Sequence, residues 1–297
     1  MKFILGGGVA GLVSAFYLPE YYLITDKIGG WQNRNTFQLG PRLLEVTPAT
    51  TAFLKKLNLP TNEKRILIGY RVGDFTGSSK NNNFAKQYAL KTREQENVDA
   101  VLSGNKDVLT VFDIDYDLIL KRLEDEVKVR IIVDKITHID LKKQNLNANQ
   151  WDEIVNTLPL NLFCKLSNFN DLQRDFTAFH TTFLKVKHTD YTKFFYRVYD
   201  YIYSVDTAWH RCNIFRDYAV LEVKGKVDTQ LEYWPDGSEI FEILDKITIP
   251  FAQMKYSYKD LTQITPHVIN VGRYAQWDHS IKMEQIIEQY ERTKTNI

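Results

Sequence analysis

The chain has 297 residues, of which 44% are hydrophobic and 25% charged, a balance typical of a globular protein with one large core or two smaller ones. A net charge of +1 excludes a global basic field for nucleic acid or a membrane surface. Cys164 and Cys212 form no CxxC pair, and the histidines lack HxxxH or HExxH spacing, which argues against a zinc site or a disulfide framework.

The first element is a short apolar run, KFIL, which precedes three glycines and the apolar segment VAGLVSAFYL. Gly6, Gly8 and Gly11 have the spacing G-x-G-x-x-G. We expect a strand, a tight turn at Gly6 and a helix that ends at Pro19. In such a turn the second glycine lets the backbone approach a pyrophosphate, and the third allows the helix to pack closely on the strand.

A second strand, YYLIT, follows and ends at Asp26, which is placed to accept a hydrogen bond from an adenosine ribose. The start of the helix, which includes Gly7, Val9 and Ala10, offers free N–H groups and a positive dipole end to phosphates. The alternative is a secretory signal, with Lys2 as its positive start and VSA as a cleavage site. We favour a retained nucleotide-binding turn and a cytoplasmic protein, because free thiols suit a reducing compartment.

Directly after Asp26 comes DKIGGW, with Lys27, Gly29, Gly30 and Trp31. This segment resembles the FAD-binding start of the flavin amine oxidase superfamily, which includes protoporphyrinogen oxidase, phytoene desaturase and UDP-galactopyranose mutase. The resemblance implies FAD as cofactor and an α/β fold of the Rossmann, NAD(P)-binding-like type. It also implies that the glycine pair lines the phosphate and ribitol.

Four later segments match the same family in the same order. FQLGPRLLEVTPATTAFLKKLNL resembles the segment that passes the flavin ring and then enters a helix, which implies that Gly40, Pro41 and Arg42 lie by the cofactor. VRIIVDKITHIDL resembles the strand pair that touches adenine, at Ile136. WDEIVNTLPL resembles the returning strand, with Thr157 near the cofactor.

The fourth segment, VINVGRYAQWDHSIKMEQIIEQY, resembles the C-terminal flavin segment. The resemblance implies that Gly272 and Arg273 lie by the pyrophosphate and ribitol. A helix beginning near Met283 and Glu284 would direct its N-terminus at the flavin, where it favours negative charge. Arg273 stands where many such flavoproteins carry Asp, as in the mutase subgroup, and the chain is shorter than most members.

We expect a discontinuous FAD-binding domain, residues 1–70, 113–165 and 255–297, and a smaller β-rich substrate domain, residues 71–112 and 166–254. In the first, DIDYDLILKRLEDEV predicts an amphipathic helix with Asp113 as N-cap and an apolar stripe of Ile114, Leu118 and Leu123. In the second, GDFTGSSKNNN reads as a polar loop or lid and AKQYALKTR as a strand edge. FLKVKH, KFFYRVYDYIYSVD and YAVLEVKG read as antiparallel strands.

The stretch AWHRCNIFRDY resembles a mutase segment in which an arginine contacts substrate phosphate. Arg211 would be that arginine and Arg216 a second positive group, although a strand with surface arginines explains the pattern slightly better. His210 is a weaker candidate, because a single unpaired histidine is more often structural. Arg42 and Arg211 are therefore the candidate catalytic residues, as groups that hold an anionic substrate near the flavin.

These features predict an FAD-dependent oxidoreductase that takes hydride from a substrate C–H bond, by amine oxidation or desaturation. A sugar-nucleotide mutase that uses reduced FAD and a catalytically idle flavoprotein remain alternatives. The expected partner is a small-molecule substrate or a modified macromolecule, without a nucleic-acid signal. No apolar run after residue 20 reaches the roughly 20 residues that span a bilayer.

Overall fold

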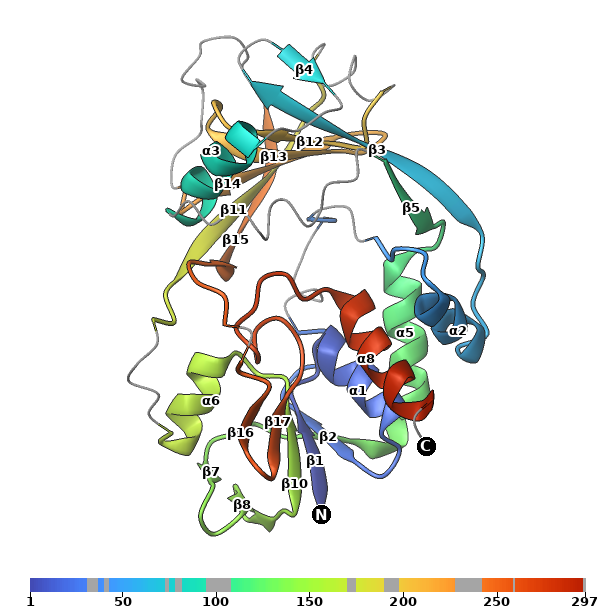
Figure 1. The fold of residues 1–297 in the computed structure, drawn as a ribbon, viewed down its shortest axis with the longest axis vertical. Coiled ribbons are helices and arrows are strands. Elements are labelled where there is room, and N and C mark those ends of the chain that lie inside the picture. Colours follow the sequence, from blue (N-terminus) through green and yellow to red (C-terminus); the bar gives the residue numbers. More distant parts are fainter. Residues whose placement is uncertain are drawn as a thin grey trace.

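The computed structural model describes residues 1–30, 37–39, 43–72, 75–77, 82–94, 108–169, 175–189, 198–227, 242–258 and 260–295. A mainly parallel sheet with its helices forms one end of the molecule, and a larger sheet forms the other (Figure 1). No helix among the described residues is long and apolar enough to cross a membrane.

The first sheet has the mainly parallel arrangement that the sequence predicts. Its strand order is β16 (Gln263–Thr265), β17 (Val268–Asn270), β10 (Glu153–Asn156), β1 (Lys2–Leu5), β2 (Tyr22–Thr25) and β6 (Ile131–Val133). All neighbours pair in parallel except β16 with β17. Along β1, Phe3 and Leu5 face one hydrophobic cluster and Ile4 faces another, so both sides of the sheet are covered.

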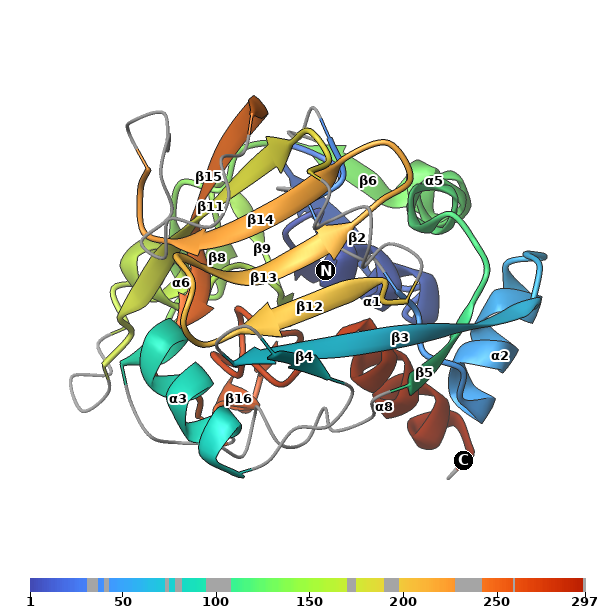
Figure 2. The same ribbon diagram turned by 90° about the horizontal axis from the view of Figure 1, so that it is seen from above.

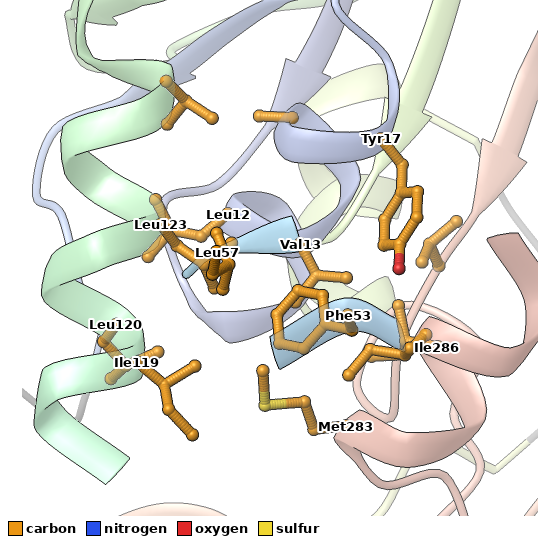
Figure 3. Close-up of a cluster of buried hydrophobic side chains, with 14 of the residues drawn as sticks. Leu12, Val13, Tyr17, Phe53, Leu57, Ile119, Leu120, Leu123, Met283 and Ile286 are labelled. Atoms are coloured by element: carbon orange, nitrogen blue, oxygen red, sulfur yellow. The ribbon is translucent and has the colours of Figure 1, made fainter. Parts of the chain in front are cut away.

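Helices cover one face of this sheet. They are α1 (Val9–Tyr17), α2 (Pro48–Lys56), α5 (Tyr116–Val127) and α8 (Met283–Thr295). Figure 3 shows their side chains meeting in one cluster, among them Leu12 of α1, Leu123 of α5 and Ile286 of α8. The termini of the chain thus share one core, because α8 packs against α1 and α2.

The opposite face carries smaller elements. These are α6 (Leu160–Ser167) and a three-stranded sheet of β7 (Ile139–Asp140), β8 (Asn145–Leu146) and β9 (Asn149–Gln150). Phe163 of α6 and Leu146 of β8 are fully buried against Phe3 and Leu5 of β1. The sheet is therefore the middle of three layers.

The helix predicted from DIDYDLILKRLEDEV is present, but two of its details were wrong. Asp115, not Asp113, is the N-cap, and its carboxylate accepts the N–H of Asp117 at 3.0 Å. Leu118 is 43% exposed, whereas Ile119 and Leu123 are fully buried. Because the helix begins two residues later than predicted, a different set of apolar residues faces the core. After the helix, a 3-10 turn, η2 (Lys128–Arg130), leads into β6.

The second sheet contains eight strands within the described residues. Its order is β15 (Ile243–Met254), β11 (Ala178–Val186), β14 (Ala219–Lys224), β13 (Trp209–Ile214), β12 (Tyr201–Ser204), β3 (Glu63–Val72) and β4 (Phe75–Gly77), with β5 (Val108–Phe112) also paired to β3. In Figure 2 its strands run across α1 and α8. The predicted antiparallel pattern holds from β15 to β12, whereas β12 and β3 pair in parallel. Residues 193–197 of the predicted strand KFFYRVYDYIYSVD lie outside the described residues.

The segment AKQYALKTR forms a helix, α3 (Asn82–Arg93), so the predicted strand edge was wrong. Its buried residues Phe84, Ala85, Ala89 and Thr92 recur at helical spacing. The helix packs against β13 and β15. Lys91 fixes it there, donating hydrogen bonds to the carbonyl oxygens of Trp209 at 2.6 Å and Ser204 at 3.0 Å.

Candidate cofactor and substrate site

The parallel strands of the first sheet bring most of the predicted cofactor residues to one edge. Gly6, Asp26 and Thr157 each follow directly on the last residue of β1, β2 and β10, and Gly272 lies two residues beyond β17. β1 leads through α1 to β2 on one side and pairs with β10 on the other, so the order of the chain reverses there. In open α/β sheets, ligands bind outside the carboxyl ends of the strands at such a point.

The glycine turn between β1 and α1 needs its glycines for different reasons. Gly6 has φ +101°, and a Cβ on Gly11 would lie only 1.8 Å from the Gly6 carbonyl oxygen. Gly8 is the N-cap of α1 without a side-chain capping bond, and a Cβ there would meet no atom within 4 Å. The chain therefore leaves open the space in front of the first N–H groups of α1.

Thr157 holds this turn in place. Its hydroxyl lies 2.7 Å from the carbonyl oxygen of Leu5, to which it donates, and 3.0 Å from that of Gly6. The same hydroxyl oxygen would lie 3.0 Å from a Cβ on Gly6 and 3.1 Å from one on Gly11. Thr157 thus lies at the predicted edge, where it supports the backbone that would contact a phosphate.

Three further glycines, from two other segments of the chain, approach the same turn. The N–H of Gly29 donates to the carbonyl oxygen of Gly7 at 2.7 Å, and a Cβ on Gly30 would lie 3.3 Å from the Gly8 Cα. Gly272, with φ +93°, would place a Cβ 2.6 Å from that of Ala10. The turn at Gly6–Ala10, the pair Gly29–Gly30 and the segment at Gly272 can approach this closely only because glycine has no side chain.

Among the other predicted cofactor residues at this edge, some are exposed and some pack against a hydrophobic core. Asp26 and Lys27 are exposed beside the turn, and the N–H of Lys27 donates to the hydroxyl of Thr25 at 3.1 Å. Val9 packs with Ala10 against the helical core. Ile136 lies three residues beyond β6 and packs against the core on the other side of the sheet.

Arg273 and the start of α8 complete this region. The Nε of Arg273 donates to the carbonyl oxygen of Ile281 at 3.0 Å. Met283 is buried in the helical core, and the Glu284 carboxylate accepts the N–H of Glu45 at 2.9 Å. Burial raises the pKa of Glu284. A ligand in front of α8 would therefore meet its backbone N–H groups, because these two side chains are engaged elsewhere.

Trp31, Gly40, Pro41 and Arg42 lie outside the described residues, so their predicted contacts with the cofactor remain expectations.

Arg211 is held by a carboxylate that the sequence reading missed. Arg211 of β13 lies opposite Glu222 of β14, and its Nη2 and Nε lie 2.5 Å and 2.7 Å from one carboxylate oxygen of Glu222. Although burial opposes it, Arg211 lowers the pKa of Glu222, so the pair is charged at neutral pH. Arg216 is exposed in the turn after β13 and takes no part in this pair.

His210 lies beside the same carboxylate. Its Nε2 is 3.4 Å from the second oxygen of Glu222 and 3.0 Å from the side-chain nitrogen of Gln253. The histidine is 1% exposed, and no described residue hydrogen-bonds its buried Nδ1. Burial lowers the pKa of His210, so its ring is neutral at pH 7.

The sequence reading also missed Arg93, at the end of α3, and passed over His279, which follows Asp278. Arg93 is 7% exposed, and its buried Nε has no hydrogen-bond partner among the residues that the structure describes. Burial lowers the pKa of His279 well below its usual value, and Arg273, Arg93 and Arg211 act in the same direction. The helical spacing of AKQYALKTR would have placed Arg93 on a buried face.

Comparison with solved structures shows which fold these features define. A crystal structure of reduced UDP-galactopyranose mutase matches with a TM-score of 0.65 and 11% identity, covering 100% of this chain and 96% of that one. Cyclohexylamine oxidase from Brevibacterium oxydans matches with a TM-score of 0.66 and 9% identity, covering 99% and 98%. Putrescine oxidase bound to putrescine matches with a TM-score of 0.59 and 11% identity, again covering 99% and 98%.

No protein-family model and no curated protein sequence matches the chain. The structural matches show that the chain has the fold shared by UDP-galactopyranose mutase and the amine oxidases, over nearly its whole length. The α/β fold of the Rossmann type with a second, strand-rich region is thereby confirmed. The similar enzymes are flavoenzymes that bind FAD.

Proposed function

We propose that the protein binds FAD and is an oxidoreductase that takes hydride from a substrate C–H bond, by amine oxidation or desaturation. The observation that carries the proposal is the edge of the first sheet, where Gly8 leaves open space in front of α1 and two distant glycine segments close on the same turn. The fold shared with flavin-dependent oxidases supports the same conclusion.

The residues present fit the cofactor. The first N–H groups of α1 would bind the pyrophosphate beside Gly7, Gly8 and Gly30, since no described residue lies within 4 Å of a Cβ on Gly8. The exposed carboxylate of Asp26, at the end of β2, would accept a hydrogen bond from the ribose. Gly272 would let the C-terminal segment approach, with Arg273 beside it.

Bound FAD would supply a two-electron acceptor, which no side chain provides. The chain would bind, orient and enclose the substrate. Arg211, held rigid by Glu222, would present its guanidinium to an anionic part of the substrate. The α8 N-terminus would favour negative charge close to it through the helix dipole. The assignment of residues 1–70, 113–165 and 255–297 to a cofactor domain, and of the rest to a substrate domain, belongs to the same proposal.

A mutase-type reaction with reduced FAD is the second candidate. The arginines at positions 211 and 273 support it, as does the fit to reduced UDP-galactopyranose mutase over the full chain. The two functions differ in whether the oxidised protein consumes its substrate.

The test begins with the visible spectrum of the purified protein, before and after reconstitution with FAD. We expect a bound flavin, and folded protein that takes up none would contradict the proposal. Anaerobic bleaching by amines would favour the oxidase. Turnover of sugar nucleotides only after chemical reduction would favour the mutase instead.

A further inference from the structure

Two buried asparagines lie opposite each other at the carboxyl edge of the first sheet, where β10 and β17 run side by side (Figure 1). Asn156 is the last residue of β10, Asn270 is the last residue of β17, and the two are partners in the parallel register. Both are 0% exposed, and the Nδ2 of Asn156 donates to the Oδ1 of Asn270 at 2.9 Å. The two strands that carry Thr157 and Gly272 just beyond their ends are thus joined by a side-chain hydrogen bond.

Backbone groups fix the orientation of both amides. The Oδ1 of Asn156 accepts the N–H of Leu158 at 3.0 Å, and the Nδ2 of Asn270 donates to the carbonyl oxygen of Leu261 at 2.9 Å. Neither amide can exchange its oxygen and nitrogen without losing one of these bonds. The bond between the two side chains therefore has a single direction, from Asn156 to Asn270.

Asn156 is linked to the glycine turn through the two residues that follow it. The side chain of Leu158, whose N–H Asn156 binds, would lie 3.1 Å from a Cβ on Gly6. Thr157, between them, has its hydroxyl 2.7 Å from the carbonyl oxygen of Leu5. Asn156 therefore holds the short segment that supports the turn between β1 and α1.

Asn270 is linked to the same turn through the segment after β17. Its carbonyl oxygen accepts the Nε2 of Gln276 at 2.9 Å, and the N–H of Gln276 donates to the carbonyl oxygen of Gly272 at 3.0 Å. Gly272 in turn approaches Ala10 at the start of α1, where its Cβ would lie 2.6 Å from that of Ala10. Asn270 therefore holds the segment that closes on the start of α1.

We propose that Asn156 and Asn270 are positioning residues of the cofactor edge, whose bond sets the place of the Gly272 segment relative to the glycine turn. This role rests on the proposed function, because it takes this edge as the FAD site. Both side chains are fully buried, so they act through the backbone and not by contact with the cofactor. Apolar side chains of similar size would fill the same space, but only a directional hydrogen bond fixes one segment to the other.

The test replaces the donating amide by a group whose ability to donate depends on pH. Asn156→Asp keeps the shape and the oxygen that Leu158 binds, but its carboxylate places a second acceptor opposite the Oδ1 of Asn270. At about pH 8 we expect FAD to bind at least tenfold more weakly than to the wild type, measured by fluorescence titration of the flavin. Burial raises the pKa of a carboxyl group, and the protonated form can donate, so this ratio should shrink as the pH falls to about 5.5.

The pH profile reports the introduced group because the three strands concerned carry few others. Within β1, β10 and β17 the only titratable side chains are Lys2 and Glu153, which pair with each other at 2.8 Å at the amino ends of β1 and β10. Unchanged affinity at about pH 8, or a weakened affinity whose ratio to the wild type does not depend on pH, would overturn the inference.

A matched control separates positioning from a general loss of stability. Thr182 is also fully buried, and its hydroxyl lies 2.9 Å from that of Thr248, which joins β11 to β15 in the larger sheet. We expect Thr182→Val and Asn156→Asp both to lower the midpoint of urea denaturation, but only Asn156→Asp to weaken FAD binding. Equal weakening by both variants would overturn the inference. If Asn156→Asp does not fold, Asn156→Ser, whose shorter side chain cannot reach Asn270, should weaken FAD binding to a similar extent.

Amide hydrogen exchange of the apoprotein needs no flavin, so the two proposals fail separately. At about pH 8, Asn156→Asp should speed exchange in residues 6–12 and 268–276 more than Thr182→Val does, because it releases both segments. Unchanged exchange in either segment would overturn the inference whether or not the protein binds FAD. A wild type that takes up no FAD would refute the proposed function, and faster exchange in both segments would then still support the link between them.

Discussion

Gly8 and Gly11, in the turn between β1 and α1, are needed for different reasons, and alanine substitutions distinguish them. At Gly8 the backbone has φ −75°, which any residue adopts, and a Cβ meets no protein atom. We expect Gly8→Ala to change the free energy of unfolding by no more than about 1 kcal/mol. It should weaken FAD binding at least tenfold, measured by fluorescence titration of the flavin, because the methyl group occupies the phosphate space.

Gly11→Ala is the contrasting variant. Its Cβ would lie 1.8 Å from a backbone oxygen, which requires the turn itself to move. We expect this variant to yield little folded protein, measured by circular dichroism and size-exclusion chromatography. Unchanged FAD affinity in Gly8→Ala would refute the assigned phosphate space, whatever Gly11→Ala does.

Thr157 tests whether the turn needs support from a neighbouring strand. Thr157→Val keeps the shape of the side chain but removes the hydroxyl that contacts the carbonyl oxygens of Leu5 and Gly6. We expect a loss of about 1–2 kcal/mol in the free energy of unfolding, measured by urea denaturation, together with weaker FAD binding. Thr157→Ser, which keeps the hydroxyl, should recover most of the FAD affinity. A valine variant that binds FAD as the wild type does would show that the hydroxyl serves stability alone.

At the scale of elements, one buried ion pair joins β13 to β14. Glu222→Gln would leave Arg211 without its carboxylate, and we expect a loss of roughly 3 kcal/mol in the free energy of unfolding at pH 7. The pKa of Glu222 is lowered by Arg211 in the folded state. Its stabilisation is therefore complete above its ordinary pKa of about 4.5 and is lost as the pH falls towards 2.

The difference between wild type and Glu222→Gln should accordingly shrink as the pH falls from 5 to 3, measured by chemical denaturation at each pH. Glu242→Gln is the control, because its pair with Lys187 is exposed on both sides and is expected to contribute less than about 1 kcal/mol. A pH-independent difference would show that the carboxylate acts through packing rather than charge.

For the whole molecule, the last helix completes the core that the first helix begins. Ile287 of α8 is fully buried, Tyr290 stacks on Tyr17 with ring centroids 5.1 Å apart, and its hydroxyl donates to Ser14 at 2.9 Å. We expect Ile287→Ala to lower the free energy of unfolding by about 2–4 kcal/mol, measured by urea denaturation. Gln289→Ala, on the exposed face of α8, should change it by less than about 0.5 kcal/mol. Equal effects would contradict the packing described.

Much of this arrangement was predictable because glycines and proline mark it locally. Gly6, Gly8, Gly11 and Pro19 predicted β1, the turn and the end of α1, and the later strands follow from short apolar runs. The sequence of α3 also has a helical period, but the segment AKQYALKTR was predicted to be a strand because it is short and contains tyrosine and leucine.

The pairing of Arg211 with Glu222 was not predictable in the same way, since it depends on the register of two strands. A glutamate within the apolar run YAVLEVKG marks a strand, but not which basic side chain lies opposite. The same limit applies to Arg93, whose burial depends on how α3 packs against a sheet formed from later residues.

The contact between Gly272 and Ala10 has a consequence for how the protein is made. Gly29 and Gly30 are synthesised soon after the glycine turn, but Gly272 follows much later in the chain. At 5–20 residues per second, roughly 13–52 s pass between the synthesis of Ala10 and that of Gly272, and until then α1 lacks this contact. If this edge binds the proposed cofactor, the complete binding site therefore forms only after Gly272 has been synthesised.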